Sequence, residues 1–176
     1  MKLDFMNNQF KTFEEACIFV KSLPYKRNVN KENIYAIIEE NGGTCSTKHA
    51  YLKRISDEFS IENVQLMLGI FMMNSNNTPK IKFVLDKYKI SEVPEAHNYL
   101  KVDGKILDCT RKGSSENDFI DDLVEEIEIK PSQITDFKVQ FQQDFIQKYL
   151  LQHPEIQYSL DEFWKIREEC ILALQS

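Results

Sequence analysis

The chain has 176 residues, of which 42% are hydrophobic, and a formal net charge of −6 at pH 7. This length suits one domain with its own hydrophobic core, and the negative charge argues against a general affinity for nucleic acid or anionic membranes. The longest apolar run, residues 64–73, is about half the length that a membrane helix needs, and the N-terminus lacks the apolar stretch of a signal peptide. We therefore expect a cytoplasmic protein whose four cysteines are free thiols.

Three helical patterns occupy the N-terminal part of the chain. Residues 12–23, 30–41 and 44–59 each repeat apolar side chains at helical spacing. The first pattern begins with the residue spacing of a capping box. The second ends at the sequence NGG, residues 41–43, which is typical of a left-handed C-cap.

Strand patterns follow. Residues 64–73 are apolar throughout and rich in β-forming residues, which indicates a central strand, and residues 78–88 indicate a short helix. Residues 97–110 predict a hairpin around Asp103-Gly104, the pair preferred in a two-residue type I′ turn. This turn would pair Val102 with Lys105.

A strand at 123–129 and two helices complete the chain. The acidic run at 116–128 is expected to form a solvated edge. The helices start near residue 135 and at Ser159, and they are expected to cover the core. The apolar stripe expected for the first helix is Phe137, Phe141, Phe145 and Tyr149.

These elements predict an α+β fold in which an antiparallel sheet packs against a central N-terminal catalytic helix, with two C-terminal helices. We expect a single domain over residues 1–176. Its core would cover about residues 30–112, and residues 113–176 would form a strand and a helical extension. The oligomeric state is not predicted by any pattern in the sequence.

The hairpin brings a histidine and a carboxylate together. A two-residue turn at 103–104 would pair Tyr99 with Asp108. His97 would then lie on the same face as Asp108, as a diagonal neighbour with about 7–8 Å between the backbones. Cys109 would point to the other face.

Cys45 stands at the predicted start of the third helix, where the positive end of the helix dipole favours a thiolate. A thiolate nucleophile, a histidine base and a carboxylate that orients the histidine are the three parts of thiol-based acyl transfer. Cys45, His97 and Asp108 would supply them. His49 lies on the same helix face as Cys45 and is expected to support the site by packing.

The segments GTCSTKHAYLKRI at 43–55 and EAHNYLKVDGKILDCT at 95–110, with an apolar strand between them, resemble the transglutaminase-like branch of the papain-like cysteine superfamily. In that branch the shared order is a cysteine at a helix start, a histidine on a strand and an aspartate on the next strand. Asn98-Tyr99 replaces the tryptophan that often follows the family histidine. The chain is similar to small stand-alone members of bacterial type.

The resemblance implies that Cys45 is the nucleophile, His97 the general base and acid, and Asp108 the residue that orients the histidine. It implies hydrolysis of an amide, or acyl transfer from one, in a peptide, protein or small molecule, without a cofactor or metal. The backbone N–H of Cys45 is the first candidate oxyanion donor. The further candidates for oxyanion or substrate contacts are Tyr25, Asn28, Asn41 and Tyr99.

Three alternatives use the same residues. A catalytically inactive module of the same fold would hold a peptide or protein in the cleft. An enzyme that transfers an acyl group from a thioester donor to a small amine would need a carrier such as coenzyme A, and the sequence lacks a Gly-rich phosphate cradle. No run of acidic residues resembles an EF-hand loop, so we expect no calcium requirement of that type. A zinc-dependent hydrolase would use the ligands Cys45, His49, His97 and Asp108.

Overall fold

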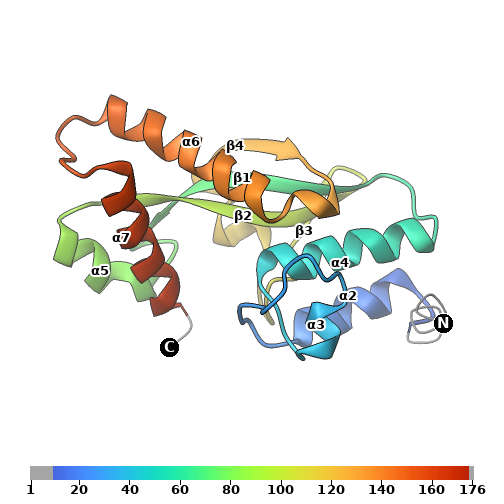
Figure 1. The fold of residues 1–176 in the computed structure, drawn as a ribbon. Coiled ribbons are helices and arrows are strands. Elements are labelled where there is room, and N and C mark those ends of the chain that lie inside the picture. Colours follow the sequence, from blue (N-terminus) through green and yellow to red (C-terminus); the bar gives the residue numbers. More distant parts are fainter. Residues whose placement is uncertain (1–9, 175–176) are drawn as a thin grey trace. The chain divides into compact units, whose positions relative to one another are not determined.

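The computed structural model describes residues 10–174 (Figure 1). Its helices are α2 (Phe13–Ser22), α3 (Ala36–Glu39), α4 (Cys45–Glu58), α5 (Lys82–Tyr88), α6 (Asp136–Gln152) and α7 (Leu160–Ala173). Its strands are β1 (Val64–Asn74), β2 (Glu92–Val102), β3 (Lys105–Leu107) and β4 (Leu123–Glu128). They form one antiparallel sheet in the order β3-β2-β1-β4, so β1 is a central strand and β4 an edge strand. The predicted α+β class is confirmed.

Among the described residues, four short 3-10 helices connect these elements. They are η1 (Pro79–Ile81), η2 (Glu116–Asp118), η3 (Ile120–Asp122) and η4 (Pro131–Gln133). Within residues 10–174, no helix has both the length and the apolar character that a membrane span requires.

Two compact units make up the chain. Unit 1 contains Met1–Leu68, Asn98–Glu116 and Ile127–Thr135. Unit 2 contains Gly69–His97, Asn117–Glu126 and Asp136–Ser176. In unit 1, α4 packs against α2 and α3, and in unit 2, α7 packs against α5 and α6 (Figure 1).

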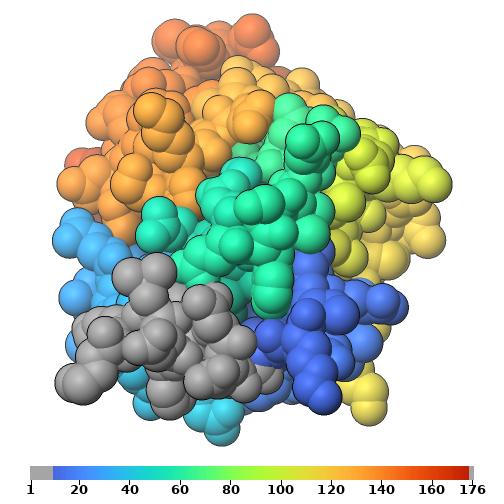
Figure 2. Space-filling model, turned by 90° about the vertical axis from the view of Figure 1, so that its right-hand side faces the viewer, coloured from blue at the N-terminus to red at the C-terminus, as the bar shows by residue number. Residues whose placement is uncertain are grey.

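Helix caps confirm the predicted starts of α2, α4 and α7. The side chains of Thr12, Thr44 and Ser159 each accept a hydrogen bond from the backbone N–H three residues later. Thr44 and Ser159 complete full capping boxes. Residues Cys45–Leu52 of α4 are all buried, whereas its C-terminal half reaches the surface of unit 1 beside α2, as Figure 2 shows.

The helix predicted at 30–41 is wrong in length, because α3 covers only Ala36–Glu39. In the segment before α3, two asparagine side chains accept hydrogen bonds from backbone N–H groups. The Oδ1 atom of Asn30 accepts from the N–H of Glu32, and that of Asn33 accepts from the N–H of Tyr35, both at 3.0 Å. Such local bonds compete with helix formation.

The hairpin turn is confirmed. Asp103 (φ 49°) and Gly104 (φ 77°) both have the positive φ of a type I′ turn, and Val102 pairs with Lys105. The ladder ends at the Leu100–Leu107 pair, because β3 has only three residues. The predicted pairing of Tyr99 with Asp108 therefore lies beyond the observed ladder.

α6 buries only Tyr149 of the predicted aromatic stripe, and Phe141 and Phe145 are half-buried. Its buried residues are Lys138, Gln142, Ile146 and Tyr149, whereas Phe137 is 41% exposed. The burial of the polar side chain of Gln142 is compensated by hydrogen bonds within unit 2. Its amide donates to the carbonyl oxygen of Pro94 at 2.9 Å and to Glu95 Oε2 at 3.0 Å.

Candidate functional site

The segment before α4 lies alongside the loop that follows α2. Tyr25 forms a parallel bridge with Gly43. The N–H of Lys26 donates to the carbonyl oxygen of Gly43, and the N–H of Gly43 donates to that of Pro24, both at 3.2 Å. The backbone of the candidate Tyr25 thereby pairs with Gly43, which is two residues before Cys45, the first residue of α4.

Close packing explains the glycine before the cysteine. A Cβ atom on Gly43 would lie 2.6 Å from Thr47 Oγ1 and 2.7 Å from Ile37 Cγ2, closer than real Cβ contacts. Asn41, another candidate, has a left-handed φ of 51° and an exposed side chain just after α3. The NGG sequence thus ends α3 and brings the chain tightly against the first turn of α4.

Asn28 fixes this loop from the inside. Its Nδ2 donates to the carbonyl oxygen of Gly42 at 2.9 Å, and its Oδ1 accepts from the hydroxyl of Thr47 at 2.7 Å. Both ends of the buried amide are therefore engaged by the segment around Cys45. Asn28 holds the backbone that presents the thiol.

Cys45 is the first residue of α4 and is 8% exposed. Its Sγ lies 3.9 Å from the hydroxyl oxygen of Ser46. That hydroxyl donates to Asn98 Oδ1 at 3.0 Å, and Asn98 Nδ2 donates to the carbonyl oxygen of Met67 at 2.9 Å. A buried polar chain thus connects the start of α4 to strands β2 and β1 within unit 1.

His49 uses both ring nitrogens on backbone groups and is fully buried. Its Nδ1 lies 2.8 Å from the carbonyl oxygen of Cys45, which can only accept, so Nδ1 carries the proton. Its Nε2 accepts from the N–H of Cys109 at 2.8 Å. His49 is therefore a neutral ring that joins the Cys45 turn to Cys109.

Lys48, the residue before His49 in α4, binds the segment that contains Cys109 and Thr110 as well. Its Nζ is fully buried and donates to the carbonyl oxygens of Leu23, at 2.6 Å, and of Thr110, at 2.7 Å. Asp108 Oδ1 accepts from the N–H of Thr110 at 2.8 Å. Side chains thus satisfy the backbone of residues 109 and 110, which explains why this segment leaves β2 after Leu107.

Asp108 is buried and lies in unit 1 with Cys45. Its Oδ1 is 3.6 Å from His49 Nε2. Because that nitrogen already accepts the N–H of Cys109, we interpret the contact as packing and not as a salt bridge. The structure brings Cys45 and Asp108 to the two sides of the His49 ring.

Cys109 was not expected in this cluster. It is fully buried, and a hydrogen bond from the Cys17 thiol of α2 lowers the pKa of Cys109 and raises that of Cys17. Lys21, one turn after Cys17, donates to the carbonyl oxygen of Ser114 at 2.7 Å. α2 therefore lies along the segment 109–114.

His97 is the last residue of β2 that belongs to unit 2. Its ring makes edge contacts with the rings of Phe119, at a centroid distance of 4.8 Å, and Phe71, at 6.2 Å. The other candidate on this strand, Tyr99, is fully buried. The joint action of Cys45, His97 and Asp108 stays a prediction.

Lys48 and Cys109 are the residues of the buried cluster that sequence reasoning missed. The signal for Lys48 was available, because a lysine three residues after Cys45 falls close to its helix face. The signal for Cys109 depended on strand alternation, which no longer applies once the chain leaves the β2–β3 ladder.

The zinc alternative finds no ligand set among residues 10–174, where no group of three or more histidine, cysteine, aspartate or glutamate side chains is arranged to hold a metal ion. His49 would also have to give up one of its two backbone bonds to bind zinc. We therefore do not propose a zinc site.

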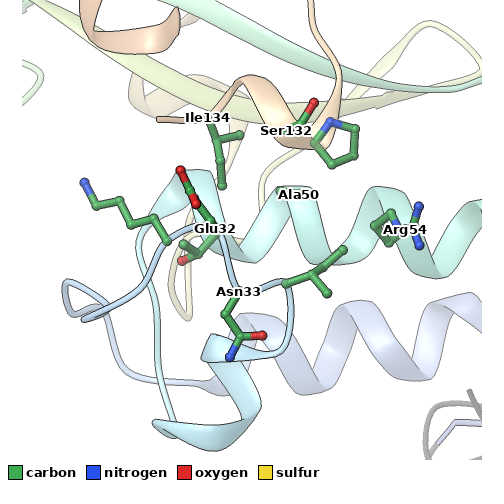
Figure 3. Close-up of a pocket in the computed structure, with 10 residues that line it drawn as sticks. Glu32, Asn33, Ala50, Arg54, Ser132 and Ile134 are labelled. Atoms are coloured by element: carbon green, nitrogen blue, oxygen red, sulfur yellow. The ribbon is translucent and has the colours of Figure 1, made fainter. Parts of the chain in front are cut away.

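A cavity of about 270 Å³ lies on another side of α4 (Figure 3). α4 contributes Thr47, Ala50 and Arg54, and the segment 31–34 and η4 supply the opposite walls. At 3.6 residues per turn, these three residues face roughly away from Cys45. The cavity is thus not an approach to the thiol.

Comparisons with known proteins give no relative for this chain. No protein-family model matches it, and neither the curated proteins nor the solved structures include a significant match. The resemblance to the transglutaminase-like branch therefore rests on the motifs at 43–55 and 95–110 alone.

Proposed function

We propose that the protein hydrolyses an amide bond, or transfers its acyl group to an amine, through the thiol of Cys45. The observation that carries this proposal is the place of Cys45 at the first position of a 14-residue helix, beside a buried polar cluster that includes Asp108. Helix starts carry unsatisfied N–H groups and a positive dipole end, which favour a thiolate and a developing oxyanion.

In the proposed reaction, His97 accepts the proton of the Cys45 thiol, and Asp108 orients the imidazole. The thiolate attacks the amide carbonyl carbon, the C–N bond breaks, and the imidazolium protonates the departing amine. Water or another amine then releases the acyl group from the thioester. Hydrolysis is the favoured outcome, and the substrate class is a peptide, protein or small amide.

The choice of His97 rests on its position in the motif at 95–110. The next residue, Asn98, accepts a hydrogen bond from Ser46 in the first turn of α4. The backbone of β2 at this point therefore lies near the residue that follows Cys45. Consecutive strand residues point to opposite faces, so the His97 ring lies on the other face of β2, against Phe119 and Phe71, and the proposed proton transfer requires the ring to leave these contacts.

The test is the rate of iodoacetamide modification of each cysteine against pH, read by mass spectrometry, in the wild type, in His97→Ala and in the control His153→Ala, whose histidine contacts the carbonyl oxygen of Tyr149 and lies outside the cluster. We expect Cys45 to react well below pH 8 in the wild type and in His153→Ala, and to lose this advantage in His97→Ala. The internal controls are Cys17, Cys109 and Cys170.

Two results would overturn the proposal. If Cys45 reacts like an ordinary thiol in the wild type, no thiolate is stabilised at the helix start. If an amide-cleaving activity survives Cys45→Ala unchanged, the thiol is not the nucleophile. Peptide binding without turnover, unchanged in Cys45→Ser, would favour the non-catalytic binding module of the same fold.

A further inference from the structure

Lys48 is a buried cation three residues after the proposed nucleophile. Residues three apart on a helix are neighbours on its surface, about 5–6 Å between Cβ atoms. The Lys48 side chain is fully buried, and its Nζ is held by the carbonyl oxygens of Leu23 and Thr110 at 2.6 and 2.7 Å. Its position is therefore fixed.

The side chains that act on the Lys48 ammonium are Cys109, Asp108 and Cys45, and each becomes negative when it loses its proton. Burial lowers the pKa of Lys48 to about 8, whereas Cys109, Asp108 and Cys45 act in the opposite direction and raise it. Lys48 is thus charged at neutral pH. Its neighbour His49 is a neutral ring, because its Nε2 accepts a backbone N–H.

Apart from His49, the other titratable groups that influence this cluster lie on α2 and act on the pKa of Cys109. From α2, the Cys17 thiol donates a hydrogen bond to Cys109, and Lys21 adds a positive charge near it. Neither group is among those that act on Lys48 directly. Lys48 is therefore a cation of this cluster that acts on both Cys45 and Asp108.

We propose that Lys48 is a positioning residue for Cys45, whose buried ammonium favours the Cys45 thiolate while it binds the Asp108 segment to α4. The proposal rests on the proposed function of Cys45 as a nucleophile. A lysine that served only as a structural tie would not need its charge, because a neutral donor also binds carbonyl oxygens. The test must therefore separate the charge from the tie.

The first test is the pH profile of Cys45 alkylation in Lys48→Met and in the control His49→Gln. Both variants alter a side chain that binds the 108–110 segment, but only Lys48→Met removes a charge. We expect the Cys45 rate at pH 7 to fall at least tenfold in Lys48→Met, which corresponds to one unit of pKa. The His49→Gln profile should keep the wild-type midpoint. Equal midpoints in the wild type and Lys48→Met would overturn the proposal.

The second test uses the wild-type lysine and so does not depend on whether Lys48→Met folds. The pKa of Lys48 is followed by the ¹³Cε resonance in the wild type and in Cys45→Ala. Coupling between two sites is reciprocal, so loss of the thiolate must lower the pKa of Lys48 if the lysine stabilises that thiolate. An unchanged Lys48 titration in Cys45→Ala would overturn the proposal.

The two proposals fail in different ways. A shifted Lys48 titration without any amide turnover would leave the Lys48–Cys45 coupling intact and remove the proposed reaction. If Cys45 is reactive and the pH profile of its alkylation is the same in the wild type and in Lys48→Met, the proposed reaction stands and the proposed role of Lys48 does not.

Discussion

His49 and Cys109 are joined by a hydrogen bond of 2.8 Å from the backbone N–H of Cys109 to Nε2 of His49. The other ring nitrogen donates to the carbonyl oxygen of Cys45 at 2.8 Å. A single neutral side chain thus connects the helix start that carries the proposed nucleophile with the segment that carries Asp108.

Loss of this ring should lower the free energy of unfolding. His49→Ala leaves the buried N–H of Cys109 without its partner, at about 1–3 kcal/mol, and the lost ring leaves a cavity, so we expect a loss of about 3 kcal/mol in urea denaturation. The control is His153→Ala, since His153 contacts the carbonyl oxygen four residues before it in the same way but is only half-buried. Equal losses in the two variants would contradict the assigned role of His49.

Gly43 should tolerate no side chain. Gly43→Ala would bring a methyl group to 2.6 Å from Thr47 Oγ1, and Thr47 must then move away from Asn28. We expect a loss of about 3 kcal/mol, at the upper end for overpacking.

Gly104→Ala is the matched comparison for Gly43→Ala. Its Cβ would meet nothing within 4 Å, and only the positive φ of 77° is unfavourable. The expected loss is about 1 kcal/mol. Thermal and urea unfolding of both variants test the difference, and a smaller loss at Gly43 would show that the first turn of α4 is not tightly packed.

The buried charge of Lys48 makes stability depend on pH. Burial lowers its pKa from the ordinary 10.5 to about 8. Between pH 8 and 10.5 the unfolded chain therefore binds more protons at this site than the folded one, so the free energy of unfolding rises with pH. Lys48→Met removes this contribution, and the wild type should gain roughly 3 kcal/mol relative to the variant across that range.

Urea denaturation of both proteins at each pH measures this difference. Comparison of the two curves also cancels the opposite effects of Tyr51, Tyr149 and Cys170, whose pKa values burial raises to about 12. A difference that stays constant from pH 8 to 10.5 would mean that Lys48 titrates like an exposed lysine.

Glu95 and Arg167 form a buried ion pair in unit 2. Glu95 Oε1 accepts from Nη2 and Oε2 accepts from Nε of Arg167, both at 2.6 Å. Arg167→Met leaves a buried carboxylate without its partner and should cost about 3–5 kcal/mol. The double variant Glu95→Leu/Arg167→Met should lose less, because no buried charge remains.

A double-mutant cycle in urea measures the coupling of this pair. The exposed pair Lys82–Asp86, whose side chains are each 64% exposed, serves as the control, and Lys82→Met should cause no measurable change. Additive losses at Glu95 and Arg167 would show that the two charges are not coupled.

The features predicted correctly from the sequence were those that depend on near neighbours in the chain. Thr44 and Ser159 cap their helices by bonds to residues three positions away, and Asp103-Gly104 forms its turn alone. The end of β3 was not predictable in this way, because Lys48 and His49 bind its continuation across about 60 residues.

The two other errors have separate reasons. α3 is short because Asn30 and Asn33 bond locally, an effect that apolar periodicity does not register. The buried face of α6 includes Lys138 and Gln142, and the partners of Gln142 lie 47 and 48 residues away in the sequence. Among the candidate site residues, Cys45 and Asp108 belong to unit 1 and His97 belongs to unit 2, and the bonds of Lys48 to Leu23 and Thr110 are evident only in the tertiary structure.

Lys48 and His49 hold the segment after β3 through its peptide N–H and C=O groups, which every residue type except proline possesses. Substitutions at Cys109 and Thr110 that preserve side-chain volume would leave this attachment in place, whereas substitutions at the two helix positions would remove it. A saturation-mutagenesis survey should therefore find a wider range of accepted amino acids at 109 and 110 than at 48 and 49.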